Sequence, residues 1–388
     1  MVFLKKKEDC CGCSACVQVC PIKCIDFKED EDGFAYPEID LELCVHCNLC
    51  KTVCPALVPF AEHRPYQVYA VKNLNDSVRL KSSSGGVFRI LAEKTLDAGG
   101  VVFGARFNTD WSVIHDYVDN KFDLELLQGA KYMQSRLENT FSQVATFLKA
   151  GKKVLFSGTP CQIAGLKKYL KTEYNNLLTV DLICHGVPSS KVWQSYLKST
   201  LKVANAESIR DVTFRAKDDG WHRYALKFSV FDINGDKKYI RSCHSDNEYM
   251  KLFLSDLMLR PSCYNCFSRS GRSGADITLG DFWGVDEKYP DLDDDKGVSI
   301  VLVNRRNSVL ESLLKDSEVQ YRIISLHEAT ERNCSYFQSP PRPIIPVAYK
   351  LLDMCGYISF MKYLYPIYNI INKAVNKLRR MKFIMRKY

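Results

Sequence analysis

Ten of the seventeen cysteines in the chain lie between Cys10 and Cys54, and most of them follow one spacing that occurs twice. Each copy reads C-x2-C-x2-C-x3-C-P. The first runs from Cys10 to Pro21 and the second from Cys44 to Pro55. The x2 spacings let a looped backbone present three thiolates to one iron–sulfur cluster, while the fourth cysteine, next to proline, reaches the other cluster. The spacing therefore predicts two 4Fe-4S clusters.

The same rule predicts which cysteines hold which cluster. Each cluster takes the first three cysteines of one copy and the last cysteine of the other copy. The predicted ligands are Cys10, Cys13, Cys16 and Cys54 for one cluster, and Cys44, Cys47, Cys50 and Cys20 for the other. Cys11 and Cys24 fall outside the pattern, and we expect them to be small buried hydrophobic side chains. A zinc ribbon or a disulfide framework is disfavoured, since neither needs this double register.

A second group of cysteines lies further along the chain, near the ends of predicted strands. Cys161 and Cys184 each follow a buried strand, and the carboxyl ends of parallel strands meet at one edge of a sheet. Cys263 and Cys266 add a C-x2-C pair. These cysteines could together hold a third cluster, whereas a zinc knuckle or unrelated thiols are alternatives that the spacing leaves open.

Two loops could hold an anionic or aromatic cofactor. The run KSSSGG at 81–86 stands directly before a predicted helix, where backbone N–H groups and the helix dipole favour a phosphate or a flavin edge. An ordinary serine N-cap is the commoner explanation of such a run. The second loop is DITLGDFWG at 276–284, in which Asp276 or Asp281 could orient a cofactor group or merely cap a turn.

Predicted strands and helices must bring these residues together. Between 77 and 200, predicted helices alternate with strands, which is typical of an α/β core. These strands are expected at 101–107, 113–119, 153–156 and 178–183. From 209 the pattern is mixed α+β, with strands expected at 211–216, 225–231, 238–241, 276–280 and 299–303.

This pattern predicts an α+β and α/β fold with distinct parts. We expect a two-cluster ferredoxin-type domain at 1–57, a connector at 58–76, the first and second parts of the core at 77–200 and 201–340, and a basic helical tail at 341–388. The length of 388 residues is ample for more than one domain.

The net charge of +9 comes mainly from the tail, because the chain has eight Lys and Arg and no acidic residue after Asp353. Around 367–387 the pattern fits a basic amphipathic helix, which could pack on its own domain, lie on anionic lipid or bind an acidic redox partner. Nucleic acid is not expected as a partner. Without a spanning apolar run or a signal peptide, we expect a cytoplasmic protein with membrane association through the tail as an option.

Taken together, these motifs resemble one known family. The chain resembles the family of coenzyme F420 hydrogenase/dehydrogenase beta subunits, in the version with an N-terminal two-cluster ferredoxin domain. The matching stretches occur in family order: SSSGGV at 82–87, GAKYMQS at 129–135, VLFSGTPCQIAGL at 154–166, ICHGVPS at 183–189, FRAKDDGW at 214–221, CYNC at 263–266, DITLGDFWG at 276–284 and DKGVS at 295–299.

The resemblance implies an iron–sulfur flavoprotein oxidoreductase. Such a protein would bind FAD, or FMN, beside an iron–sulfur centre, take electrons from reduced ferredoxin or another redox protein, and pass hydride to coenzyme F420 or a small organic molecule, for example in surface-polysaccharide metabolism. It also favours the third cluster. The residues expected to contact the flavin are Lys81, Ser83, Ser84, Gly85, Gly86, Lys131, Gly158, Thr159 and Asp281.

His185, next to Cys184, is a candidate proton donor, although a structural histidine is the alternative. A different class of function also stays open: the chain could be a non-catalytic electron-transfer subunit of a larger redox complex. An iron–sulfur scaffold with a degenerate core is disfavoured by the intact GTPC, ICHG and GDFWG stretches.

Overall fold

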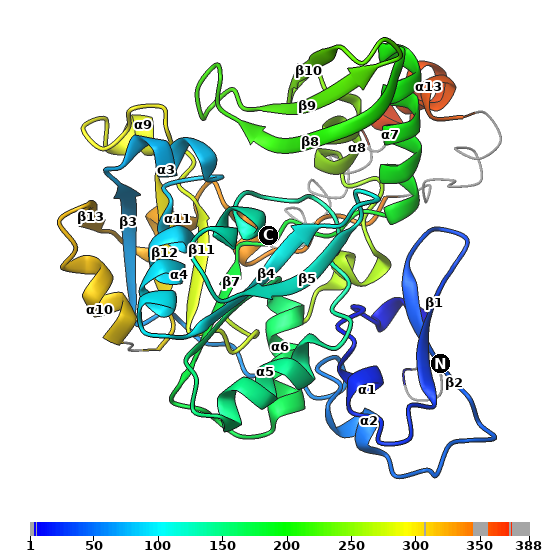
Figure 1. The fold of residues 1–388 in the computed structure, drawn as a ribbon, viewed down its shortest axis with the longest axis vertical. Coiled ribbons are helices and arrows are strands. Elements are labelled where there is room, and N and C mark those ends of the chain that lie inside the picture. Colours follow the sequence, from blue (N-terminus) through cyan, green and yellow to red (C-terminus); the bar gives the residue numbers. More distant parts are fainter. Residues whose placement is uncertain (1–3, 5, 306–307, 344–355, 372–373, 375–388) are drawn as a thin grey trace, which may run out of the picture.

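The structure is a computed structural model that describes residues 4, 6–305, 308–343, 356–371 and 374. Its N-terminal part holds the cysteine repeat, a short helix η1 (Lys7–Asp9) and an antiparallel hairpin of β1 (Ile25–Glu29) and β2 (Ala35–Ile39) (Figure 1). Each copy of the repeat forms one short helix, α1 (Ala15–Gln18) or α2 (Leu49–Thr52). The residue before each helix is left-handed, with φ of 54° at Ser14 and 61° at Asn48. The two copies therefore share one local backbone.

Within the described residues, eight strands form the central sheet in the order β13-β3-β12-β11-β7-β6-β4-β5. The neighbours β4, β6, β7 and β11 run parallel, and the outer pairs are antiparallel. The strand bounds are β3 (Gln67–Asn73), β4 (Val101–Phe107), β5 (Val113–Val118), β6 (Val154–Ser157), β7 (Leu177–Leu182), β11 (Ile277–Asp281), β12 (Ser299–Val303) and β13 (Val319–Ile323).

Helices cover both faces of this sheet, and its central strands are accordingly buried along nearly continuous apolar runs. On one face, α4 (Val87–Asp97) packs over Val102, Leu155 and Val180. On the other, α5 (Thr140–Lys149) and α6 (Pro160–Leu170) pack over Phe103 and Phe156. The shorter elements at the margins are α3 (Asp76–Lys81), η2 (Asp123–Leu127), η3 (Pro261–Asn265), α9 (Val285–Lys288), α10 (Ser308–Leu314), α11 (Leu326–Thr330) and η4 (Cys334–Tyr336).

A smaller layer stands beside the central sheet. Among the described residues, β8 (Ala206–Ala216), β9 (Ala225–Asp232) and β10 (Lys237–Cys243) form an antiparallel sheet of three strands. With α7 (Ser190–Ala204) and α8 (Glu248–Leu254), it encloses a second core rich in aromatic side chains (Figure 1). The fold is thus mixed α/β behind a ferredoxin-like N-terminal region.

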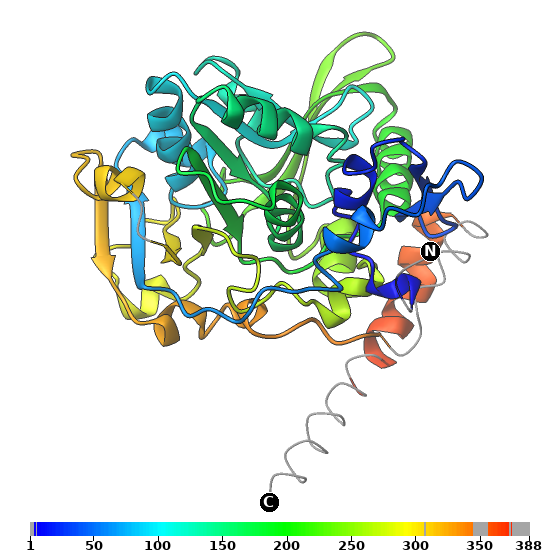
Figure 2. The same cartoon turned by 90° about the horizontal axis from the view of Figure 1, so that it is seen from below.

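The start of the predicted basic tail packs on this second core. In α13 (Tyr357–Ser359) and η5 (Phe360–Leu364), the side chains of Tyr357, Phe360 and Met361 are buried, and the Tyr357 ring lies 5.4 Å from the Tyr196 ring of α7. Figure 2 shows both segments, in orange, beside the smaller layer. The rest of the predicted tail, including most of its basic residues, lies outside the described residues. In the part of the chain that the structure describes, the helices fall short of the length and apolarity that crossing a bilayer requires.

One predicted boundary is wrong. The sequence predicts a connector over 58–76, yet residues 67–73 form β3, an interior strand of the central sheet that pairs with β12 and β13. The prolines at 59 and 65 mark the true connector, and the run that follows them, QVYAVKN, buries Val68, Ala70 and Val71 between two layers. A strand buried on both faces lacks the simple alternation by which strands are recognised in a sequence.

Candidate iron–sulfur and cofactor site

The structure brings the cysteines of each predicted cluster together. For the first set, Cys16 interacts electrostatically with Cys10 and Cys54, and Cys13 does so with Cys10 and Cys16. Burial is the main cause that raises the pKa of Cys16, and its thiol neighbours add to the shift. For the second set, Cys50 neighbours Cys44 and Cys47.

Cys20, the fourth member of the second set, is linked to the other members through Cys24, which lies outside the repeat. Its Sγ lies 3.5 Å from the Sγ of Cys24, and Cys24 also interacts with Cys44. Cys24 is buried, as expected for a cysteine outside the repeat. The two sets also adjoin each other, because Cys50 interacts with Cys16 and Cys54 of the first set. The assignment of ligands to each cluster stays a prediction.

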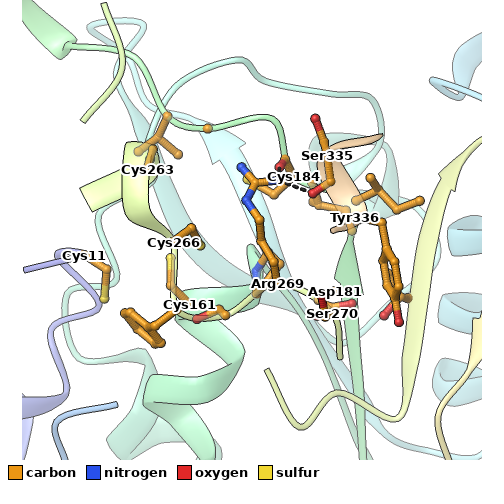
Figure 3. Close-up of a pocket in the computed structure, with 18 of the residues that line it drawn as sticks. Cys11, Cys161, Asp181, Cys184, Cys263, Cys266, Arg269, Ser270, Ser335 and Tyr336 are labelled. Atoms are coloured by element: carbon orange, nitrogen blue, oxygen red, sulfur yellow. Dashed lines mark hydrogen bonds between the residues drawn. The ribbon is translucent and has the colours of Figure 1, made fainter. Parts of the chain in front are cut away.

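The cysteines of the core meet in one pocket at the carboxyl ends of β6 and β7. Cys161 comes from the first turn of α6, Cys184 from the loop after β7, and Cys263 and Cys266 from η3 and its C-terminus (Figure 3). Burial raises the pKa of Cys263 to about 12, with added repulsion from Cys266 and Cys161. Three separate loops thus supply thiols to one buried space.

The four core cysteines stand apart from one another, and a third cluster at them stays a prediction. In the described residues, no group of three His, Cys, Asp or Glu side chains converges closely enough to hold one metal ion. A 4Fe-4S cluster binds each cysteine through a different iron, so its thiolates stand apart around a larger object.

Cys11 joins the ferredoxin-type region to this pocket. It lines the pocket beside Cys161 (Figure 3), and its thiol interacts electrostatically with those of Cys13 and Cys161. Gly165 of α6 allows this approach, because a Cβ on that residue would lie 2.9 Å from the Cβ of Cys13. Cys11 is buried in a hydrophobic cluster, as predicted, and it also stands between the first cysteine set and the core set.

Arg260 fastens the same region to the core. Its guanidinium is 1% exposed and donates to Cys10 O (2.8 Å), Ala35 O (2.8 Å) and Gln134 Oε1 (3.0 Å), and it lies 4.4 Å from the centre of the Tyr36 ring. Because Arg260 directly precedes η3, one side chain positions both the first cysteine loop and the segment that carries Cys263 and Cys266.

Arg269 orders the loop after β7. Its guanidinium donates to the carbonyls of Cys184 (2.9 Å), His185 (3.0 Å) and Ser335, and its charge opposes the effect of burial on the pKa of Cys184. The predicted proton donor, His185, has its Nε2 2.8 Å from Asp256 Oδ1 and its ring against Phe253. Deeper in the pocket, burial raises the pKa of Asp181 to about 7.

The serine–glycine loop before α4 has many of its polar groups engaged within the protein. Ser84 Oγ donates to Val298 O, Gly85 N–H donates to Ser299 Oγ, and Ser83 Oγ accepts from Ala130 N–H at 2.6 Å. The last contact places the loop beside Lys131. Gly86, with φ of 83°, forms the left-handed cap of α4.

Other predicted flavin contacts also have structural roles. Lys81 pairs with Glu125 on the surface. Thr159 caps α6, and its N–H donates to Gln162 Oε1. The N–H of Gly158 donates to Val180 O. Asp281 receives two hydrogen bonds from Arg215, at 2.9 and 3.2 Å. These contacts leave a cofactor role for the same residues untested.

Two buried basic residues near the serine–glycine loop, Arg215 and Lys217, have no role predicted from the sequence. Arg215 is 5% exposed, and Lys217 is 8% exposed with its Nζ donating to the carbonyls of Arg79, Ser84 and Lys296. Burial lowers the pKa of Lys217 to about 7, and it does the same to Lys131. Both missed residues lie in the FRAKDDGW stretch, which could have directed attention to them.

The comparisons with known proteins cover both parts of the chain. Residues 151–332 match the model of the C terminus of the coenzyme F420 hydrogenase/dehydrogenase beta subunit, and residues 9–58 match the 4Fe-4S dicluster domain. An uncharacterized protein of Methanocaldococcus jannaschii is 24% identical over 76% of this chain and 84% of its own length. The F subunit of the F(420)H(2) dehydrogenase of Methanosarcina mazei is 23% identical over 63% of this chain and 73% of its own.

Among solved structures, a chain of the F420-reducing NiFe hydrogenase complex of Methanosarcina barkeri has 17% identity and a TM-score of 0.46, with 71% of this chain and 91% of that chain covered. The sequence matches show an iron–sulfur redox protein with a 4Fe-4S dicluster domain in front of the core. The chain thus carries the C-terminal domain of the coenzyme F420 hydrogenase/dehydrogenase beta subunits behind a 4Fe-4S dicluster domain, as its motifs predicted.

Proposed function

We propose that this protein is an iron–sulfur flavoenzyme. Electrons enter singly through the two ferredoxin-type clusters, pass to a third cluster held by Cys161, Cys184, Cys263 and Cys266, and leave as hydride to coenzyme F420 or a small organic acceptor. The family and the name of the Methanosarcina mazei relative support a redox reaction of this kind. A bound flavin would supply the conversion between single electrons and hydride.

One observation carries the proposal: the core cysteines and the first ferredoxin-type set meet through Cys11. The Cys11 thiol contacts Cys13 on one side and Cys161 on the other, so a single residue spans the space between the two sets. A structural zinc site would gain nothing from this adjacency, whereas a chain of redox centres requires it.

The region between the serine loop and Asp281 fits an anionic cofactor such as FAD. Arg215 and Lys217 are buried beside it and Lys131 is half-buried, and among the described residues the Nε of Arg215 lacks a hydrogen-bond partner. Trp221 and Trp283 stack beside it, with ring centres 4.6 Å apart and planes at 8°. Arg215 is paired with Asp281, so the phosphates of a flavin dinucleotide would chiefly offset the charges of Lys217 and Lys131.

The experiment is an iron, sulfide and flavin analysis of protein purified without oxygen. Three 4Fe-4S clusters give about twelve irons per chain, and two give about eight. Cys184→Ser is expected to lower the iron content by about one cluster, while Cys334→Ser, at an exposed cysteine outside both sets, keeps the full content. A reconstituted protein without flavin, or with unchanged iron in Cys184→Ser, contradicts the proposal.

A second function is supported by the name of one relative, which describes a component of a multi-subunit dehydrogenase and suggests electron transfer within a larger complex. Single-chain activity separates the two: the flavoenzyme reduces a hydride acceptor from reduced viologen with no other protein present. His185→Gln should lower that rate while flavin content stays unchanged, if His185 donates the proton.

Cytoplasmic location and contact of the basic tail with anionic membranes belong to the proposal as well. Binding of the full chain to anionic vesicles tests the membrane contact.

A further inference from the structure

The two cysteine sets of the ferredoxin-type region differ in their distance from solvent. Cys10, Cys13, Cys16 and Cys54 are buried, whereas Cys20, Cys44 and Cys50 are partly exposed. All the predicted ligands lie in the part of the chain that the structure describes, and among them Cys47 alone is exposed. The surface of the second set is therefore the place where a partner can approach a cluster most closely.

The loop around Cys47, residues 40–48, presents apolar side chains to solvent. Leu41 is 60% exposed, Leu43 60% and Val45 62%, at alternate positions of one short segment. Singly exposed apolar residues are ordinary, but a contiguous exposed group beside a functional centre is typical of an interaction surface.

This loop is held in shape by its own polar groups. Asp40 Oδ1 accepts hydrogen bonds from the N–H groups of Glu42 (2.9 Å) and Leu43 (3.3 Å), and Asn48 Nδ2 donates to His46 O (3.1 Å). The loop would thus lose little conformational freedom when a partner binds, which favours binding.

The loop carries few charges. Asp40 and Glu42 lie in it and Lys51 lies just beyond it in α2, so these three residues leave a net charge of −1 near Cys47. An ionic docking surface would need a strong field of one sign. The surface instead has the apolar centre and polar rim of an interface that forms by burial of hydrophobic side chains.

We propose that the 40–48 loop docks an electron-donating protein that carries a one-electron centre near its own surface. This inference rests on the proposed function, because it takes the clusters to carry electrons. Electron transfer between proteins becomes rapid only when the two centres lie close together, and Cys47 offers that approach. Apolar contact, rather than charge pairing, supplies the affinity.

The test uses the full chain with its clusters, purified without oxygen. Leu43→Asp combined with Val45→Asp places two charges in the loop, and Phe122→Asp combined with Ile233→Asp makes the same change at exposed positions of the core, 90% and 59% exposed. The probe is a trace of two-cluster ferredoxin kept reduced by a ferredoxin reductase and NADPH, and the readout is the bleaching of cluster absorbance in the chain, which is in large excess and gives nearly all of the signal. Dithionite, a small reductant that needs no docking surface, is the parallel reductant.

We expect the loop variant to lose at least tenfold in its rate with ferredoxin and to keep its rate with dithionite, while the control variant keeps both. Equal rates with ferredoxin in all three proteins, a wild type that only dithionite reduces, or a tenfold fall in rate with added salt would each overturn the proposal. A dimer that dissociates in the loop variant would assign the surface to a second copy and also overturn it. Since cluster bleaching needs no flavin, a flavin-free protein defeats the proposed function without affecting this result.

Discussion

Cys11 and Val45 occupy the same position in the two cysteine repeats, one residue after the first predicted ligand. Their surroundings differ, because Cys11 is buried against the core pocket and the Val45 side chain is 62% exposed. The next residues, Gly12 and His46, both have left-handed backbones, with φ of 69° and 55°. The local structure of the repeats is therefore set by their common spacing. Their different surroundings are set by the few residues between the cysteines, and these decide which set faces the core and which faces solvent.

The largest effect is expected at Arg260, which fastens only the buried repeat. Arg260→Met leaves the buried carbonyls of Cys10 and Ala35 without their donor, at a cost of about 3–5 kcal/mol in the free energy of unfolding. Arg241→Met, which breaks an exposed pair with Asp219, should cost less than about 1 kcal/mol. Urea unfolding of both variants measures the difference, and equal costs would contradict the assigned role of Arg260.

Acid should weaken the support of the buried repeat. His115 Nε2 donates to Ser157 O and its Nδ1 accepts from Ser135 Oγ, both at 2.7 Å, beneath the loop that leads to Cys161. Burial lowers the pKa of His115 to about 4. Between pH 6.5 and 4 the unfolded chain binds the extra proton, so stability is full above pH 6.5 and falls with pH through this window, by about 3 kcal/mol in all. Unfolding at several pH values should show that slope, and His115→Phe should flatten it. A slope that is unchanged in the variant would exclude His115 as its source.

A matched pair of substitutions tests the two left-handed positions. A Cβ on Gly12 would lie 2.9 Å from both Arg260 Nη1 and Gln134 Nε2, so Gly12→Ala adds a steric clash to backbone strain and should cost about 1–3 kcal/mol. His46 already carries a side chain at this conformation and is exposed, so His46→Ala should change stability by less than about 0.5 kcal/mol. Thermal unfolding of the two variants compares them, and similar losses would mean that the repeats are equally constrained.

The smallest effect is expected at the position that Cys11 and Val45 share in the two repeats. Cys11→Ala removes one small buried group and should cost about 1 kcal/mol, whereas Val45→Ala should be nearly neutral. Only the Cys11 variant should slow the passage of electrons from the ferredoxin-type clusters to the core, which freeze-quench spectra of the reduced clusters would follow. An equal rate in both variants would show that Cys11 fills space without taking part in the route.

Much of the core was predictable because its signals are local. The strand at 101–107 and the strand at 299–303 were predicted at the bounds that β4 and β12 have, since each is a short apolar run between turn residues. The meeting of Cys161 with Cys184 followed from the rule for parallel strand ends. In contrast, β13 exposes most of its residues and has no clear apolar pattern, so it was not found.

The missed parts of the site depend on contacts between distant residues. Arg260 lies 250 positions from the Cys10 carbonyl that it binds, and Lys217 lies 133 positions from Ser84. The spacing within one motif predicts how that motif folds, but it does not predict which other motif will pack against it. The role of Cys11 between two cysteine sets was hidden for the same reason.

The interior place of β3 has a consequence for how the parts of this chain stay together. Since the polypeptide passes from the cluster-bearing region into a strand between β12 and β13, that region is joined to an interior strand of the sheet, one position from the edge strand β13. Cutting the backbone at 58–66 should leave two fragments that elute as one particle, joined by Arg260 and Gln134. An inserted spacer there would lengthen the tether without letting the clusters swing away from the core.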